Sequence, residues 1–195
     1  MARNPVHVRD ATPEDAQTLV AMWQDNLESS ARQPAPTVDS AVRGIGHLAL
    51  DPEQRLVLAE VDDEVVGVAY LVRSPLSPLH DETAVRVGRL FVRSDQRRRG
   101  VGRALLAAAA AWADEKQTAH LRITVSSAAR DANRFLARLG FAAIAHVRAT
   151  SVPVLQERLA RFEAVDTDGH VVVERLRTLR RRQASARLTR RVSGD

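Results

Sequence analysis

The order of hydrophobic and polar residues over the first fifty positions predicts one short strand followed by two helices. Residues 6–9 alternate as in a strand, and Thr12–Asp15, with a proline in second place, indicates a helix start. The apolar residues that follow fall on one helical face: Leu19, Met22, Trp23 and Leu27. Two prolines then interrupt the chain, and a weaker helix with two glycines is expected from Thr37 to Leu50.

The hydrophobic period then changes to that of strands. Segments 55–61 and 65–73 flank an acidic turn at Asp62 and Asp63, which predicts a β-hairpin. A further strand is expected from Ala84 to Val92.

An alanine-rich helix is expected from Gly100 to Lys116. Its apolar face is formed by Val101, Leu105, Ala108 and Trp112. A strand at 120–125, a helix ending at Gly140 and a strand at 141–149 follow. This order predicts an α/β (α+β) fold with a mixed, mostly antiparallel central sheet flanked by helices.

The end of the chain differs in composition from the rest. Residues 152–162 predict a further helix, and we expect one domain over 1–162 and a basic C-terminal extension over 163–195, partly helical or disordered. Residues 170–195 hold 8 arginines and 2 acidic residues. Two interpretations stay open: a helix with a solvated end, or a contact with nucleic acid, although no aromatic residue follows Phe162 to stack on bases.

Composition excludes several classes of protein. A chain of 195 residues with 45% hydrophobic and 27% charged residues has the balance of one soluble globular domain, and its longest apolar run is too short to span a membrane. The first residues contain no apolar signal segment, so a cytoplasmic location is expected. The chain has no cysteine and its six histidines are far apart, so we expect no disulfide, thiolate chemistry or metal.

Charge is distributed in blocks. Residues 1–84 hold 6 arginines against 14 acidic residues, whereas residues 85–103 hold 7 arginines and one acidic residue. This distribution favours an anion bound in the middle of the chain and a cation recognised elsewhere. Alternatively, the acidic helices are simply solvated.

The basic block contains the segment R-R-R-G-V-G-R, between a strand that ends near Val92 and a helix that begins at Gly100. A helix start offers unpaired N–H groups and partial positive charge to a phosphate, and glycine lets an anion approach the backbone. Arginine adds donors suited to phosphate oxygens. A diphosphate is therefore the expected ligand. The P-loop pattern is absent, and Leu105 stands where the dinucleotide fingerprint needs a third glycine.

The segment from Arg97 to Gly102 matches the Arg/Gln-x-x-Gly-x-Gly/Ala loop of the Gcn5-related N-acetyltransferases. A second motif of that family, "LGF", places Gly140 38 residues beyond Gly102, and the order of elements is similar to that of the family from about residue 5 to 150. The resemblance implies binding of acetyl-CoA. It implies strand contacts with pantetheine and loop contacts with diphosphate through Leu90, Phe91, Val92, Arg97, Arg98, Arg99, Gly100, Val101, Gly102 and Arg103. The asparagine often seen in the family's final helix is displaced, because Ala129 stands at the aligned position and Asn133 follows four residues later, still within reach of the cofactor.

The chain departs from this family at the residues that usually move protons. Gly88 stands where many members have a glutamate base, and Leu136 where many have a tyrosine acid. Two explanations stay open for the base: the cluster His80, Asp81 and Glu82, acting directly or through water, or orientation of the reactants alone. Ser126 is a candidate proton donor to the thiolate, and Tyr70 is expected to be packed.

The resemblance therefore predicts an N-acetyltransferase in which an amine attacks acetyl-CoA directly in a ternary complex. The acidic first half predicts a cationic acceptor, either a small molecule or a protein amino group. The alternative is a protein without catalysis that binds CoA or a nucleotide as a regulator, or binds nucleic acid through its tail. A homodimer is left open.

Overall fold

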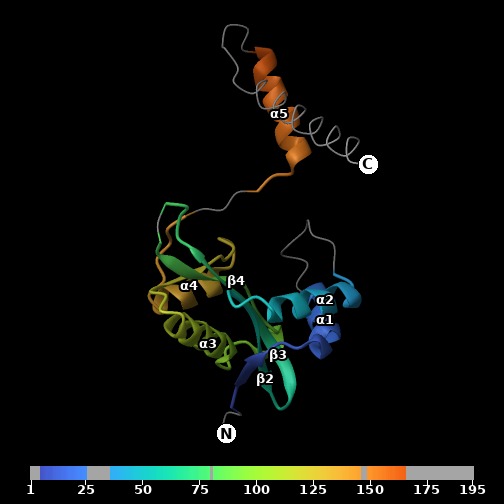
Figure 1. Cartoon of the computed structure of the whole chain (residues 1–195), viewed down its shortest axis with the longest axis vertical. Helices are drawn as coiled ribbons and strands as arrows, with labels where there is room; N and C mark the ends of the chain where they lie inside the picture. The colour runs from blue at the N-terminus through green and yellow to red at the C-terminus, as the bar shows by residue number, and fades with distance from the viewer. Residues whose placement is uncertain (1–4, 26–35, 80, 146–148, 166–195) are drawn as a thin grey trace, which may run out of the picture. The chain divides into compact units, whose positions relative to one another are not determined.

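The computed structural model describes residues 5–25, 36–79, 81–145 and 149–165 (Figure 1). The chain divides into two compact units, Met1–Gly140 and Phe141–Asp195. The first unit contains a five-stranded sheet in the order of the sequence: β1 (His7–Asp10), β2 (Gln54–Val61), β3 (Glu64–Pro75), β4 (Thr83–Val92) and β5 (His120–Ile123). The predicted limits at residues 162 and 163 stay a prediction.

The sheet is antiparallel except at its last pair. β1, β2, β3 and β4 pair antiparallel in succession, and β4 pairs parallel with β5. Asp62 and Asp63 form the β2–β3 turn with φ angles of 54° and 62°, the left-handed backbone that a two-residue hairpin turn requires. The predicted fold class, including the hairpin, is confirmed.

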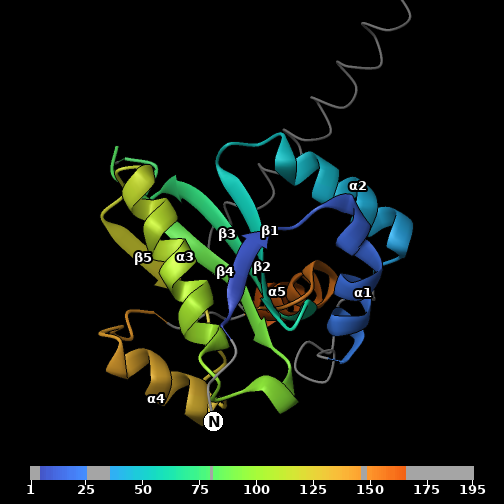
Figure 2. The same ribbon diagram turned by 90° about the horizontal axis from the view of Figure 1, so that it is seen from below.

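Helices lie on both faces of the sheet (Figure 2). The described residues of the first unit form the helical segments η1 (Pro13–Asp15), α1 (Ala16–Asp25), α2 (Val38–Ala49), η3 (Ser94–Gln96), α3 (Val101–Glu115) and α4 (Arg130–Arg138). α3 packs on one face, where Gly67 of β3 lies against Val101, and Trp23 of α1 lies on the other face, over Arg89 of β4.

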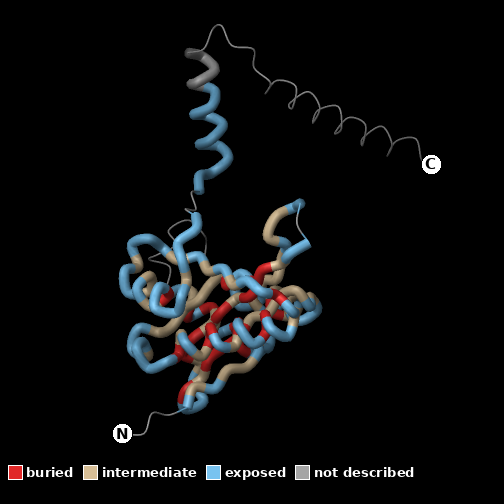
Figure 3. Tube along the Cα trace, turned by 90° about the vertical axis from the view of Figure 1, so that its left-hand side faces the viewer, coloured by how far each residue is buried: buried red, intermediate tan, exposed pale blue. Residues whose placement is uncertain are grey.

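The buried residues follow the strands and the helices that pack on both faces of the sheet (Figure 3). Val57, Leu71, Val85 and Val87 of the strands and Leu105 of α3 are all buried to within 2% exposure. The predicted apolar face of α3 is wider than expected. Leu106, Ala109 and Ala113 are buried too, whereas Ala108 is only partly buried.

The predicted strand at 141–149 is wrong for the residues that the structure describes. Residues 141–145 and 149 form no strand. The segment Phe141–Ala145 contains three alanines, which bury little apolar surface, so strand pairing would stabilise it weakly. The predicted helix after it is confirmed as α5 (Val152–Val165), and residues 166–195 lie outside the described part of the chain.

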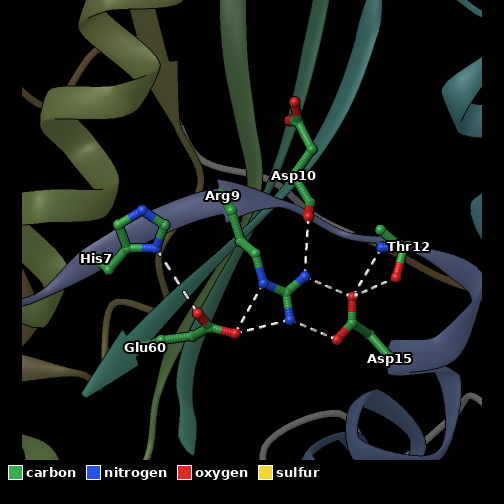
Figure 4. A network of polar contacts seen from close by, with 6 residues as sticks. All are labelled: His7, Arg9, Asp10, Thr12, Asp15 and Glu60. Atoms are coloured by element: carbon green, nitrogen blue, oxygen red, sulfur yellow. Dashed lines mark hydrogen bonds and ion pairs between the residues drawn. The ribbon is translucent and has the colours of Figure 1, made fainter. Parts of the chain in front are cut away.

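A polar network ties β1, β2 and η1 together (Figure 4). Arg9 donates to both carboxylate oxygens of Asp15 at 2.7 Å and to Glu60 Oε1 at 2.8 Å. Asp15 also accepts from the backbone N–H of Thr12 at 2.7 Å, which caps the helix start predicted from the sequence. The Arg9 guanidinium lowers the pKa of Asp15 to about 2.

We predict that Asp15→Asn loses about 2 kcal/mol of unfolding free energy at neutral pH, because the pKa of Asp15 falls from 3.8 to about 2 on folding. Because the pKa of Asp15 is lowered in the folded protein, its full contribution to the free energy of unfolding is present above about pH 4. This contribution is lost as the pH falls towards 2. Denaturant titrations of both proteins across this range would test it. Asp10→Asn is the control and should cost less than about 1 kcal/mol, since Asp10 pairs with Arg55 but is 60% exposed. A loss that did not change with pH would contradict the prediction.

Candidate functional site

β4 contains a bulge at Gly88 and then parts from β5. Tyr70 of β3 pairs with Arg89, but the next residue of β3, Leu71, pairs with Val87, so Gly88 is left without a partner. The parallel ladder between β4 and β5 ends where Val87 pairs with Ile123. Beyond Gly88, β4 therefore has an edge that no described strand covers. The predicted pantetheine contacts, Leu90, Phe91 and Val92, lie in this stretch.

Glycine is the residue that fits the bulge. A Cβ atom at position 88 would lie 3.2 Å from Tyr70 Cδ1 and 3.3 Å from Arg86 Nη1. The hydroxyl of Tyr70 donates to Gln54 Oε1, and its ring is partly buried, as expected for a packed tyrosine. Position 88 therefore holds neither a carboxylate nor the space for one without rearrangement.

The arginine and glycine loop ends at the start of α3. Arg98 and Gly100 adopt left-handed backbone with φ angles of 62° and 95°. The N–H groups from Arg98 to Arg103 have no backbone acceptor among the described residues, and Ala104 N is the next to bond, to Gly100 O at 2.9 Å. A row of open donors at the positive end of a helix of 15 residues suits an anion.

The loop arginines remain available to such an anion. Arg97, Arg98, Arg99 and Arg103 are exposed, and none forms an ion pair with an acidic residue in the described ranges. Arg97 contacts Val92 O at 3.5 Å, and Arg99 donates to Gln96 Oε1 at 3.1 Å. Asp95, the acidic residue of this block, is held at 2.8 Å by Arg93.

Gly102 faces a contact that the sequence did not indicate. A Cβ atom there would lie 3.8 Å from Phe135 of α4 and 3.9 Å from Val92 of β4, which is ordinary van der Waals distance. Phe135 therefore lines the first turn of α3 together with the end of β4. The sequence motif around Gly102 carries no signal for this residue, because it comes from a different helix.

Asn133 and Ser126 are brought together. The Asn133 side-chain amide donates to Ser126 O and Ala129 O, both at 2.9 Å, and Ser126 Oγ accepts from Ala128 N at 3.3 Å. The pair braces the loop between β5 and α4. Asn133 Oδ1 takes no part in these bonds, and the side chain of Ser126 is exposed.

The predicted acidic cluster is not brought to the bulge. Asp81 and Glu82 are exposed at the start of β4, where Glu82 O accepts from Leu76 N at 2.8 Å. Six residues of extended strand separate Glu82 from Gly88, which is about 20 Å. His80 lies outside the described residues. Leu136, at the position of the family's tyrosine, is buried in α4 with 6% exposure.

The sequence model of the acetyltransferase (GNAT) family matches residues 18–141. The chain belongs to this acetyltransferase family. The match covers β2 to β5, the arginine loop and α3, so the geometry described above is that of a GNAT domain. No curated protein sequence matches this one.

Solved structures agree on the GNAT fold. A transcriptional regulator from Bacillus halodurans C-125 is 25% identical, with a TM-score of 0.67 over 75% of this chain and 99% of that one. An aminoglycoside N-acetyltransferase in complex with CoA is 16% identical, with a TM-score of 0.62 over 76% and 95%. A ribosomal-protein-alanine N-acetyltransferase from Brucella melitensis biovar Abortus 2308 is 20% identical, with a TM-score of 0.59 over 75% and 99%.

Two further findings concern ligands and membranes. Within the described ranges, no three histidine, aspartate or glutamate side chains gather closely enough to hold a metal ion. None of the helices that the structure describes has the length and apolar character to cross a membrane.

We predict that Gly100→Ala in this GNAT domain costs about 1 to 2 kcal/mol of unfolding free energy, because φ is 95° there and an L-residue is strained. Gly44→Ala is the matched control. Gly44 lies inside α2 with nothing within 4 Å of its added Cβ, so that change should stabilise by about 0.5 to 1 kcal/mol. Thermal and urea unfolding would measure both. Equal effects of the two changes would show that the left-handed loop geometry is wrong.

Proposed function

We propose that this GNAT protein transfers an acetyl group from acetyl-CoA to an amine. The observation that carries the proposal is the position of the arginine loop. Its open N–H groups and four exposed arginines lie at the end of β4, next to the stretch of that strand that β5 does not cover. An extended ligand with a diphosphate at one end and hydrogen-bonding amides along its length suits this arrangement.

The residues present fit acetyl-CoA as co-substrate. The N–H groups from Arg98 to Arg103 and the guanidinium groups of Arg97 and Arg99 would hold the diphosphate, and Gly102 leaves room for it because its nearest neighbours are 3.8 Å from an added Cβ. The backbone of Leu90, Phe91 and Val92 would bond the pantetheine amides as a neighbouring strand would. Val101 is 1% exposed and serves the site by fixing the helix start.

The reaction forms one bond and breaks one. The acceptor ammonium loses a proton, its nitrogen forms a bond to the acetyl carbonyl carbon, and the carbon–sulfur bond breaks. The nitrogen gives up a second proton to become the neutral amide, and the sulfur takes up one proton to leave as the CoA thiol. The products are an N-acetyl amine and CoA. The protein must orient the amine and provide for these proton transfers.

The proton transfers need an acceptor and a donor. Asp81 and Glu82 stay candidates for the base, but only through water, given the distance along β4 from Glu82 to Gly88, and His80 stays a candidate that lies outside the described residues. Ser126 stays a candidate for protonating the sulfur. Orientation of the two reactants can itself supply roughly 7 to 11 kcal/mol of barrier reduction, so a site without a dedicated base can still be active. A cytoplasmic location also stays part of the proposal.

We predict that Gly102→Ala weakens acetyl-CoA binding at least about tenfold while leaving the fold intact. An added methyl group fits the free protein, but it occupies space at the helix start that the diphosphate needs. Gly102→Val should weaken binding further. Gly46→Ala is the control, because Gly46 lies in α2 with nothing within 4 Å of its added Cβ. Calorimetric titration would measure the affinities, and unchanged affinity in Gly102→Ala would show that the diphosphate binds elsewhere.

We also predict that the alanine variants of Asp81, Glu82 and Ser126 stay within a few-fold of the unmodified protein in the rate of CoA release. The rate should rise with pH in proportion to the free amine, as expected when orientation dominates. A loss of 10²- to 10⁴-fold in one variant would instead identify that residue as an acid or base. If no amine releases CoA although acetyl-CoA binds, the protein is a CoA-binding regulator and the proposed transfer is wrong.

A further inference from the structure

Five carboxylates of the acidic first half are paired with arginine within the unit 1–140. Asp15 and Glu60 share Arg9, Glu53 lies 2.7 Å from Arg73, Asp10 lies 2.9 Å from Arg55, and Glu64 lies 3.1 Å from Arg93. The net charge of the segment therefore overstates the negative charge that an acceptor would meet.

The sheet face opposite α3 carries basic residues at the point where β4 and β5 part. Arg86 of β4 and Arg122 of β5 are partners in the parallel ladder, so both side chains leave the sheet on the same face. Their neighbours Val85 and Val87 are fully buried and point to the α3 face, which leaves Arg86 and Arg122 exposed on the opposite one. Arg89 projects from this same face, beneath Trp23 of α1.

Arg86 reaches towards the bulge. Its Nη1 atom lies 3.3 Å from the place that a Cβ of Gly88 would take. Arg86 and Arg122 form no ion pair with a described acidic residue, and like charges directly opposite each other destabilise a strand pair. A guanidinium therefore lies beside the residue at which many members of the family have a glutamate, and the adjacent positive charges of Arg86 and Arg122 would be offset by an anionic ligand.

Arg89 is held in place by stacking. Its guanidinium carbon lies 3.8 Å from the centre of the Trp23 ring, and the side chain is partly buried. Burial lowers the pKa of Arg89, so retaining a cation there is unfavourable by itself. Stacking fixes the plane of the guanidinium and orders its donors, which favours a planar anion such as a carboxylate.

From these contacts we infer that Arg86, Arg89 and Arg122 form an arginine row that binds an anionic group of the acceptor, so that the substrate is an amine that also carries a carboxylate. The inference rests on the proposed acetyl transfer and names its substrate class. It differs from the cationic acceptor that the charge blocks predict. The row lies beside the uncovered part of β4, where the proposed thioester would end.

The test compares matched amines in a CoA-release assay: amino acids and dipeptides against their carboxamides, with spermidine as a cationic amine. The carboxylates should have a kcat/KM at least about tenfold above that of the carboxamides. Arg89→Gln and Arg122→Gln should lower kcat/KM for carboxylates about ten- to a hundredfold, mainly through KM, and leave carboxamides unchanged. Arg43→Gln, an exposed arginine of α2, is the control and should behave as the unmodified protein.

A binding measurement separates failure of this inference from failure of the proposed transfer. Trp23 reports on the row, so N-acetyl amino acids, which resemble the product, should change tryptophan fluorescence in a saturable way, and their carboxamides should not. The change should disappear in Arg122→Gln, whose exposed side chain has no packing role. A preference for spermidine, or equal fluorescence changes with carboxamides, would overturn the inference. If the carboxylates bind saturably but no amine causes CoA release, the inferred anion site at the arginine row would stand and the proposed acetyl transfer would be wrong.

Discussion

The close packing of α3 on β3 is the contact on which the candidate site depends. A Cβ atom at Gly67 would lie 2.8 Å from Val101 Cγ1 and 3.2 Å from Leu105 Cδ1, so only glycine lets the first turns of the helix approach the sheet this closely. Both α3 residues are buried to within 1% exposure. This contact places the open N–H groups of the helix start beside the end of β4, where a diphosphate and an extended chain can be bound together.

β4 has different partners along its length, and this makes it the functional strand of the sheet. Its first half pairs on both sides, antiparallel with β3 and parallel with β5, whereas after the bulge at Gly88 it pairs, among the described strands, with β3 alone. The bulge also changes which residues face α1. Arg89 and Phe91 follow on the face opposite α3, and the backbone of the same stretch is open at its edge. The bulge at Gly88 therefore accompanies both the free strand edge proposed to bind CoA and the sheet face proposed to bind the acceptor.

In this protein the role of a charged side chain depends on the partner that it contacts, and not on the net charge of its segment. Five acidic residues of the first half pair with arginine inside the fold, as Asp15 and Glu60 do with Arg9 (Figure 4). The arginines of the loop and of the row are different, because Arg98, Arg103, Arg86 and Arg122 have no described carboxylate within reach. Basic residues without such partners concentrate beside β4, and this is the physical basis for proposing anions on both sides of the bulge.

The sequence by itself determined the elements and the cofactor loop, since hydrophobic period, turn residues and helix caps are local properties. The Asp62–Asp63 hairpin, the Thr12 cap and the helix start at Gly100 were all predicted from neighbouring residues, and the family followed from the spacing of two short motifs. Tertiary structure alone decided the rest. It set Phe135 against Gly102, paired Arg86 with Arg122, and left residues 141–145 without a strand partner, because each of these depends on segments that are distant in sequence. The bulge at Gly88 also depends on a distant segment, because it is defined by the pairing of β4 with β3. At this position the sequence showed only that a glutamate is missing.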